Sequence, residues 1–444
     1  MVRSKLFSGI LSLVVIPQIA LADTPRLDAL RYGIVDLGPK VTDSSATLVI
    51  NDYGHVAFPV TDSRGALILD ARDSSGAPIF STSQMLSRTI GLAPGTINNR
   101  PNSINNQDIV VGESANAVGS KAYLYDEAGM QVIPSTIPPA ASGYHRNMAM
   151  GVNDTGSLVG VFSGAHPNVS TEVFYSFATG LTGIVVPFGS DSGLIDINNI
   201  GNAIGYAAPP FSPGYNSSRS IQAGMNGLGW DQTPIAPPVG ASRYYPLRLN
   251  DFAKVVGTTR VNPTTVSGPH VLDLPTLTYT LVSPISGAPS GIATANDINN
   301  WGIVAGTSRY PGSTEYGDTH AMLARGDATK DLNALSNAAA LGLTLTSAHA
   351  INNRGDVVGV AVTGNQQYRY FLALALNSFS CAADLDGDGL VNSRDIDLIR
   401  RLQGVETFVG DLNHDRVVTA DDVKLAKIAA SNHGICPSLS TSRR

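Results

Sequence analysis

The stretch Ile351-Asn352-Asn353-Arg354-Gly355-Asp356-Val357-Val358-Gly359 holds the pattern that decides the fold of this chain. An aliphatic residue is followed by Asn, by Asn or Asp, by any residue, by Gly, and then by an apolar run that ends in Gly. Asn and Asp hydrogen-bond their own backbone in tight turns, and Gly readily adopts a positive φ. The pattern therefore predicts a hairpin whose second strand is buried.

This turn motif occurs seven times, at intervals of about fifty residues. The first Asn of the copies is, in order, Asn51, Asn105, Asn153, Asn198, Asn250, Asn299 and Asn352. Such a period is typical of the blades of a β-propeller. We therefore predict an all-β, seven-bladed β-propeller over residues 23–376. Asp108 and Ala253 replace the turn glycine in two copies, and those hairpins are expected to be slightly strained.

Three further expectations follow from the repeat. The glycine that closes each apolar run, such as Gly359, is expected to let neighbouring backbones approach near a crowded axis. The Asn pairs could be read as a ring of ligands or catalytic amides, but turn chemistry explains them fully. The segment Tyr32–Gly38 precedes the first copy and looks like the strand that the last blade would lack. We predict that this segment completes the seventh blade.

A later strand also recurs between the turn motifs. Its copies are Lys121-Ala122-Tyr123-Leu124-Tyr125, His320-Ala321-Met322-Leu323 and Tyr370-Phe371-Leu372. Together with the turn motif, this strand resembles the bacterial extracellular repeat family that is named for its His-Ala-Phe (HAF) triplet. The resemblance covers roughly residues 32–376. It implies a β-propeller and no established activity.

Two stretches near the C-terminus have the spacing of calcium loops. Ca²⁺ prefers oxygen ligands, which a twelve-residue loop supplies from positions 1, 3, 5, 7, 9 and 12. In the first loop these are Asp384, Asp386, Asp388, Leu390 (backbone), Asn392 and Asp395. In the second they are Asp411, Asn413, Asp415, Val417 (backbone), Thr419 and Asp422. We predict two Ca²⁺ sites, the second weaker because Arg416 stands where the first loop has Gly389.

An amphipathic helix is predicted after each loop, and the short segment before the first loop leaves no room for another. Residues 381–436 would then form a small all-α module of two loop–helix repeats. With Asp at position 12, this module resembles the dockerin type I (EF-hand-like) family. The resemblance implies docking to a cohesin-type protein domain through Ser393, Arg394, Ile399, Arg400 and Arg401. Ala420 and Asp421 replace the usual hydroxyl-rich pair in the second repeat, which argues against symmetric docking.

The two cysteines of the chain, Cys381 and Cys436, bracket both loops. In an exported protein an isolated pair of this kind is expected to form a disulfide, and two free thiols are the alternative. A disulfide and bound calcium would both help so small a module to fold.

The N-terminus predicts export. Arg3 and Lys5 precede an apolar run that ends in Ala20-Leu21-Ala22, the pattern of a cleavage site. Residues 1–22 are therefore a predicted signal peptide that is cleaved between Ala22 and Asp23. The mature chain would be secreted or held in the periplasm or at the cell surface, without a membrane span. Residues 377–380 are expected to be a short linker and residues 437–444 a disordered tail.

Composition and motifs narrow the function without naming a catalytic residue. The formal net charge is −6 and no basic patch occurs, which argues against a nucleic-acid partner. No Gly-x-Ser-x-Gly or His-Glu-x-x-His motif is present. Loop tyrosines could form an aromatic platform for polysaccharide: Tyr144, Tyr215, Tyr244, Tyr245 and Tyr310. Three readings remain: a tethered binding or structural protein within a polysaccharide-processing assembly, a polysaccharide-degrading hydrolase or lyase, and a propeller with a calcium-stabilised cap.

Deletion of Tyr32–Gly38 tests the predicted closure of the propeller. If this segment supplies the outer strand of the last blade, its loss exposes an unpaired strand edge and apolar side chains. We expect the melting temperature to fall by about 10 °C or more, since each kcal/mol lost is worth a few degrees in a domain of this size. An unchanged melting curve would show that the segment is not part of the last blade.

Overall fold

The computed structural model describes most of the chain, and every structural feature of the protein discussed below belongs to the described residues. These are residues 27, 30–41, 47–60, 65–73, 76–133, 147–163, 170–176, 184–187, 193–207, 219–225, 230–261, 266–289, 293–313, 318–376, 383, 391–404, 410, 412 and 417–431.

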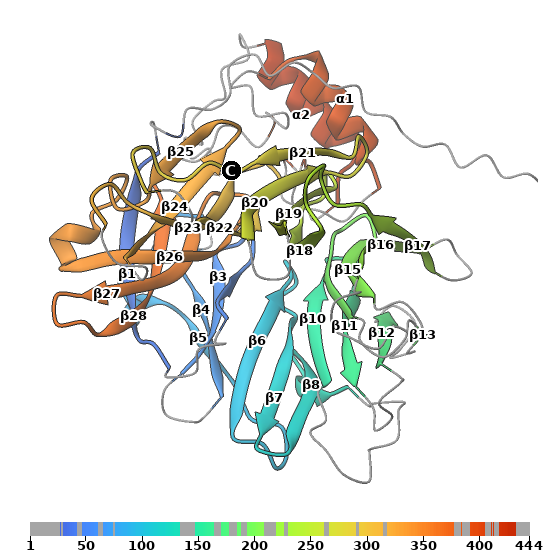
Figure 1. Cartoon of the computed structure of the whole chain (residues 1–444), viewed down its shortest axis with the longest axis horizontal. Coiled ribbons are helices and arrows are strands. Elements are labelled where there is room, and N and C mark those ends of the chain that lie inside the picture. The colour runs from blue at the N-terminus through green and yellow to red at the C-terminus, as the bar shows by residue number, and fades with distance from the viewer. Residues whose placement is uncertain are drawn as a thin grey trace, which may run out of the picture.

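The described strands form seven four-stranded antiparallel sheets, which we number in chain order (Figure 1). The first holds β2 (Val49–Ile50), β3 (His55–Pro59), β4 (Ala66–Asp70) and β5 (Ser87–Ile90). The second holds β6 (Asn98–Ile104), β7 (Val110–Asn116), β8 (Gly119–Asp126) and β9 (Gly129–Val132). The third holds β10 (Asn147–Val152), β11 (Ser157–Ser163), β12 (Ser170–Ser176) and β13 (Ile184–Pro187).

The fourth sheet holds β14 (Gly193–Ile197), β15 (Asn202–Ala207), β16 (Arg219–Met225) and β17 (Trp230–Ile235). The fifth holds β18 (Arg243–Leu249), β19 (Lys254–Arg260), β20 (Val266–Asp273) and β21 (Thr278–Leu281). The sixth holds β22 (Ala293–Ile298), β23 (Val304–Arg309), β24 (Thr319–Arg325) and β25 (Ala328–Asp331). The seventh runs β26 (Leu343–Ile351), β27 (Val357–Thr363), β28 (Tyr368–Ala375) and β1 (Tyr32–Pro39). Short 3₁₀ turns cover Thr82–Gln84 and Ala338–Leu341.

The sheets stand around a common axis as the blades of a β-propeller. The turn motif joins the first and second strands of every sheet, and the first strands of neighbouring sheets lie next to one another. Adjacent buried apolar residues in the second strand explain why each blade packs on both faces, since successive side chains in a strand point to opposite sides. Val110 belongs to the apolar cluster between the first two sheets, whereas Val111 belongs to the cluster between the second and third.

The glycine that closes each apolar run allows a close backbone approach, as expected, and the two backbones belong to neighbouring strands of the same blade. A Cβ on Gly359 would lie 2.0 Å from the carbonyl oxygen of Ser347, in the first strand of the same sheet, and 2.8 Å from the ring of Phe371. Gly112 has the same relation to Arg100 and Tyr123. The first strands carry β-bulges here, and the bulge brings the two backbones together. The recurring aromatic strand fills the space that the glycine leaves.

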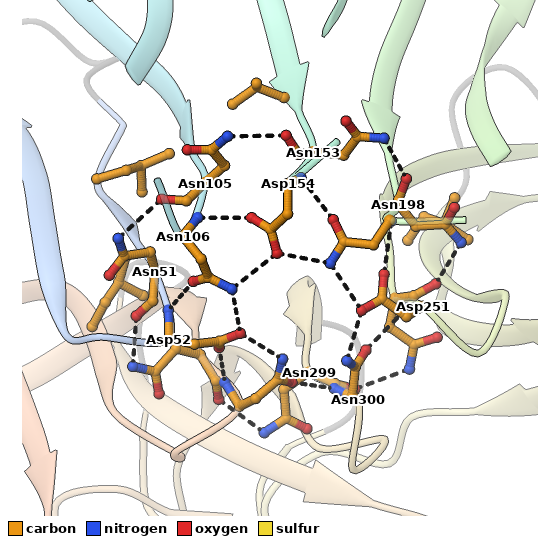
Figure 2. Close-up of a pocket in the computed structure, with 18 of the residues that line it drawn as sticks. Asn51, Asp52, Asn105, Asn106, Asn153, Asp154, Asn198, Asp251, Asn299 and Asn300 are labelled. Carbon is orange, nitrogen blue, oxygen red and sulfur yellow. Dashed lines mark hydrogen bonds between the residues drawn. The ribbon is translucent and has the colours of Figure 1, made fainter. Parts of the chain in front are cut away.

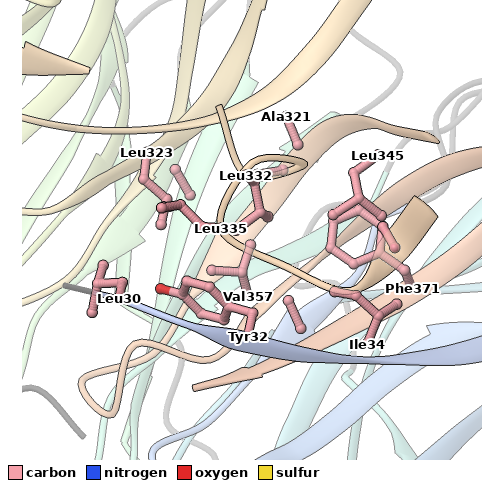
Figure 3. Packing of buried hydrophobic residues seen from close by; sticks show 14 of the residues in the cluster. Leu30, Tyr32, Ile34, Ala321, Leu323, Leu332, Leu335, Leu345, Val357 and Phe371 are labelled. Carbon is pink, nitrogen blue, oxygen red and sulfur yellow. The ribbon is translucent and has the colours of Figure 1, made fainter. Parts of the chain in front are cut away.

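The N-terminal strand completes the seventh sheet, as the sequence predicted. β1 pairs with β28 in antiparallel register, with Tyr32 opposite Ala375. Tyr32 and Ile34 are buried in the cluster that joins the sixth and seventh sheets, together with Leu335, Leu345 and Phe371 (Figure 3). Chain segments from the two ends of the propeller therefore share one apolar core.

A buried ion pair links the first sheet to the seventh. Arg72, which follows β4, donates from Nε to Oδ2 of Asp356 at 2.9 Å, and both side chains are almost fully buried. Asp356 also accepts hydrogen bonds from the Asn352 side chain and the Ala375 backbone. The carboxylate is thus fully satisfied, which a buried charge requires.

The predicted fold class needs a correction in its C-terminal part. The described residues there hold two short helices, α1 (Ser393–Arg401) and α2 (Ala420–Ser431), in a chain that is otherwise mostly strand. They do not show an all-α module of two complete loop–helix repeats, because the first parts of both predicted loops lie outside the described residues. None of the described helices is long and apolar enough to cross a membrane.

Substitution of Gly359 by Ala tests the close approach inside the blade. The added methyl group would meet a backbone oxygen, so the strands must separate, which we expect to cost about 1–3 kcal/mol. Gly364 is the matched control, because a Cβ there meets nothing within 4 Å. Urea unfolding of both variants measures the difference, and equal stabilities would contradict the packing described.

Candidate functional site

The turn motif folds as the sequence predicted, with the first Asn at its centre. The backbone N–H of Asn51 donates to the carbonyl of His55, and the carbonyl of Asn51 accepts from Gly54. The side-chain oxygen of Asn51 accepts the backbone N–H groups of Tyr53 and His55 at 3.1 and 2.9 Å. The same backbone bonds recur in all seven turns. Each Asn oxygen thus holds its own hairpin.

The side-chain nitrogen of the same Asn links each blade to the next. Nδ2 donates to the backbone carbonyl of the first Asn in the following blade, at 2.9–3.1 Å. The bonds run through Asn51, Asn105, Asn153, Asn198, Asn250, Asn299 and Asn352, and Asn352 returns to Asn51. All seven residues are buried. We call this closed circle the inner ring.

A second closed circle, the outer ring, is formed by the residue that follows each inner-ring Asn. Its backbone N–H donates to the side-chain Oδ1 of the corresponding residue in the next blade, at 2.7–2.9 Å. The members are Asp52, Asn106, Asp154, Asn199, Asp251, Asn300 and Asn353. Figure 2 shows both rings around a central opening.

Carboxylates and amides alternate around most of the outer ring. The Nδ2 of Asn106 donates to Oδ2 of both Asp52 and Asp154, at 3.1 and 3.0 Å. Asn199 bridges Asp154 and Asp251 in the same way. Seven positions cannot alternate perfectly, and the one pair of like neighbours is Asn300 and Asn353, so no two carboxylates are adjacent.

The two rings correct the expectation that turn chemistry alone explains the Asn pairs. Turn chemistry accounts for the inner-ring oxygen, whereas the inner-ring nitrogen and the whole outer ring bond between blades. The sequence signal that could have revealed this is the invariance of the first Asn in all seven copies, since Asp would serve the turn equally well. Only the amide can both accept within the turn and donate to the next blade.

The rings enclose a cavity of about 150 Å³ on the axis. Its lining consists of the two rings and the aliphatic residue that precedes each inner-ring Asn, and it includes three carboxylates and no basic side chain. Burial raises the pKa of Asp154 to about 7, although hydrogen bonds from Asn106 oppose this shift. Burial also raises the pKa of Asp251. Burial and the mutual repulsion of the carboxylates therefore lower the negative charge that the cavity carries near neutral pH.

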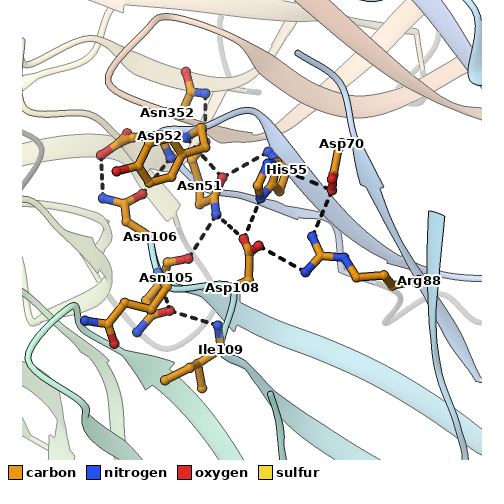
Figure 4. Close-up of polar contacts among 12 residues, drawn as sticks. Asn51, Asp52, His55, Asp70, Arg88, Asn105, Asn106, Asp108, Ile109 and Asn352 are labelled. Atoms are coloured by element: carbon orange, nitrogen blue, oxygen red, sulfur yellow. Dashed lines mark hydrogen bonds and ion pairs between the residues drawn. The ribbon is translucent and has the colours of Figure 1, made fainter. Parts of the chain in front are cut away.

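One junction carries an additional charged network beside the rings. Asp108 stands in the glycine position of the second turn with φ 61°, as Ala253 does with φ 58° in the fifth, which confirms the expected departure from relaxed geometry. Its carboxylate accepts from Asn51 Nδ2 at 3.0 Å and pairs with His55 and Arg88 (Figure 4). Burial alone would raise the pKa of Asp108, but His55 and Arg88 lower it below its usual value. The contacts offset the strain of a positive φ.

The described C-terminal residues form a second candidate site. Asp395 and Asp422, the twelfth residues of the two predicted calcium loops, are both fully buried. Asp395 accepts the backbone N–H of Asn392 at 2.8 Å, and Asp422 accepts those of Thr419 and Leu412 at 2.7 Å. Each carboxylate therefore binds backbone at the start of its helix. The helices pack through one apolar cluster that includes Val391, Ile399, Val418, Val423 and Ala426.

The remaining predicted loop ligands are divided between described and undescribed residues. Asn392, Val417 and Thr419 lie beside the two helices, and the side chain of Asn392 caps α1. The other predicted ligands lie outside the described residues: Asp384, Asp386, Asp388, Leu390, Asp411, Asn413 and Asp415. The described residues alone contain no group of three or more metal-ligating side chains. Cys381, Cys436, Ala22 and Asp23 also lie outside them.

One of the predicted partner contacts is wrong. Ile399 is fully buried in the cluster between the helices, so it cannot meet a partner. Ser393, Arg394, Arg400 and Arg401 are exposed on α1, and Arg400 pairs with Asp397 one turn away at 2.6 Å. The predicted loop positions of Tyr244 and Tyr245 are also corrected, because both belong to β18 and Tyr244 is buried, whereas Tyr144 and Tyr215 lie outside the described residues.

Comparisons with known proteins find distant structural similarity only. No family model and no curated protein matches this chain. The β-propeller domain of the Trilobed protease from Pyrococcus furiosus is similar with a TM-score of 0.45 and 11% identity, over 76% of this chain and 94% of that one. Prolyl oligopeptidase B from Galerina marginata is similar with a TM-score of 0.44 and 12% identity, over 78% of this chain and 51% of that one. Pyrococcus horikoshii acylaminoacyl peptidase is similar with a TM-score of 0.42 and 9% identity, over 81% of this chain and 54% of that one.

This chain thus spans about half the length of the two peptidases. Similarities at this level carry no conclusion about activity.

The substitution Asn353→Asp tests the outer ring. It removes the amide that donates to Asp52 and places two carboxylates side by side, which we expect to cost about 3 kcal/mol or more at pH 8. At pH 5 the cost should shrink, because burial and repulsion favour a protonated carboxyl group. Ile200→Asp adds the same charge at an exposed turn residue and serves as the control. Urea unfolding at both pH values measures the loss of stability. Equal losses in the two variants would contradict the hydrogen bonds of the outer ring.

Proposed function

We propose that this protein is a secreted binding protein, in which a β-propeller is tethered through a calcium-dependent C-terminal module to a cohesin-type partner domain. The observation that supports the module is the matched pair of buried carboxylates, Asp395 and Asp422. A buried carboxylate is costly unless charge and hydrogen bonds compensate it. Both lie where a calcium loop needs its last ligand, at the start of two helices that share one core.

The residues fit calcium in their chemistry. All predicted ligands are oxygen donors, and Asp395 and Asp422 would hold the ion from the helix side. Bound calcium would supply positive charge to the acidic loops, and the backbone bonds to both carboxylates would orient them. The module would then fold in calcium and loosen without it.

Ser393, Arg394, Arg400 and Arg401 are the side chains that we assign to partner contact. They are exposed on α1, whereas Ile399 anchors the helix in the core. Arginine suits such contacts because its planar guanidinium binds carboxylates through two hydrogen bonds. On the propeller, ligand binding fits the axial cavity better than catalysis does. The lining offers Asn, Asp and aliphatic side chains, and the Asn amides are engaged in the rings.

Calcium titration of the full chain tests the module. The wild-type protein should bind two calcium ions by calorimetry, and Asp386→Ala should lose the stronger site. Asp421→Ala is the matched control, because Asp421 is exposed beside Asp422 and is not a predicted ligand. Retention of both sites in Asp386→Ala would contradict the proposed loop.

Partner capture tests the docking function. The immobilised full chain should retain one protein from the secreted and surface proteins of the source organism in calcium and release it in EDTA. Arg400→Ala/Arg401→Ala should weaken capture about tenfold or more while calcium binding is unchanged. Capture that EDTA does not affect would contradict calcium-dependent docking.

A further inference from the structure

Four charged or titratable side chains meet where the first and second blades join. His55, Asp70 and Arg88 belong to β3, β4 and β5 of the first sheet, whereas Asp108 comes from the turn of the second sheet (Figure 4). The guanidinium of Arg88 donates to Asp70 at 2.8 Å and to Asp108 at 3.0 Å. We call these four side chains the junction network. One cation thus bridges two carboxylates that belong to different blades.

Both ring nitrogens of His55 face these carboxylates. Nδ1 lies 2.5 Å from Oδ1 of Asp108, and Nε2 lies 3.9 Å from Oδ1 of Asp70. The ring of Tyr53, a further titratable group, has its centroid 6.1 Å from that of the imidazole. A neutral imidazole carries a proton on one nitrogen only, whereas an imidazolium carries one on each. The arrangement therefore suits the charged form of His55.

The junction network contacts the inner ring directly. The backbone N–H of His55 donates to the side-chain oxygen of Asn51 at 2.9 Å. The Nδ2 of Asn51 donates to Asp108 at 3.0 Å while it also bonds the carbonyl of Asn105 in the next blade. The position of Asp108 is glycine in five of the other turns and alanine in the sixth. A carboxylate therefore reinforces the ring bond at this junction and has no counterpart in the other turns.

The charge on His55 decides whether the network is neutral. With an imidazolium the four side chains carry two positive and two negative charges. With a neutral imidazole the two carboxylates share the single guanidinium of Arg88. All four side chains are between 18% and 33% exposed, so water screens the charges only in part. Loss of the proton therefore leaves one uncompensated negative charge between the two blades.

We propose that the junction network is a pH-sensitive device, in which a proton on His55 stabilises the contact between the first and second blades. Imidazole normally changes its charge between about pH 5 and 8. Burial alone would raise the pKa of Asp108, but His55 and Arg88 hold it below its usual value, so this carboxylate stays charged over the same range. The stabilisation is therefore present in mild acid and is lost as the pH rises and the imidazole gives up its proton.

Urea unfolding of the full chain and its His55→Gln variant at pH 5.5 and 8.5 tests the device. The Gln amide keeps a hydrogen-bond donor for Asp108 but carries no charge at either pH. At pH 5.5 the substitution should raise the equilibrium constant of unfolding about fivefold, and at pH 8.5 by about twofold or less. Asp154, whose pKa burial raises to about 7, titrates in both proteins, so the comparison between them removes its contribution. An equal or larger effect at pH 8.5 would overturn the proposal.

Two further variants locate the effect. His270→Gln is the matched control, because the Nδ1 of His270 lies beside the Thr259 hydroxyl and the Gly268 carbonyl, and burial lowers its pKa. This substitution should cause no greater loss at pH 5.5 than at pH 8.5. Asp108→Asn removes the carboxylate with a residue that tolerates a positive φ. In that background the effect of His55→Gln at pH 5.5 should fall to about twofold or less. A fivefold effect that persists there would show that Asp108 is not the partner and would refute the device.

Discussion

The hydrogen bond from each inner-ring Asn to the carbonyl of the next one is the interaction on which the propeller depends. Every inner-ring carbonyl accepts two bonds, one from its own turn and one from the preceding blade. A gap between two blades would therefore leave a buried amide and a buried carbonyl unsatisfied, at a cost of about 1–3 kcal/mol for each group. Since the ring is closed, opening it at one junction also removes the constraint on its neighbours.

Closure is the step at which this arrangement needs reinforcement. The bond from Asn352 to Asn51 joins residues that are about 300 positions apart, so its formation costs more chain entropy than any other bond of the ring. The same junction carries β1 in the seventh sheet and the buried pair of Arg72 and Asp356. Residues from both ends of the propeller thus stabilise this junction through apolar contacts and an ion pair, which residues close together in the sequence do not provide.

Much of this architecture could be predicted from the sequence, and the limits have a physical origin. The turn motif, its period and the strand Tyr32–Gly38 depend on local preferences and on alternating burial, which are visible in a single chain. The invariant Asn signals a role beyond the turn, but the partners of the ring bonds could not be predicted, because each Nδ2 partner lies about fifty residues away and meets it only after the blades assemble. The close contact of Gly359 could not be predicted either, because a β-bulge in β26 brings the Ser347 carbonyl next to it. For the C-terminal module, the sequence placed Asp395 and Asp422 at helix starts. Ile399 was assigned to partner contact only through the family resemblance, although its place on the apolar face of an amphipathic helix already indicated burial.

The composition of the outer ring follows from a balance between charge and hydrogen bonding. Amide side chains alone would bring more N–H groups than the ring has free acceptors, and carboxylates alone would place seven buried charges around one axis. Alternation gives each amide two acceptors and separates the carboxylates, but an odd number of blades forces one defect. Placing Asn300 beside Asn353 leaves spare amide hydrogens at the cavity, and this costs less free energy than two adjacent buried charges would. The three remaining carboxylates are then the fewest that sustain alternation, so the acidic lining of the cavity is a consequence of building the ring.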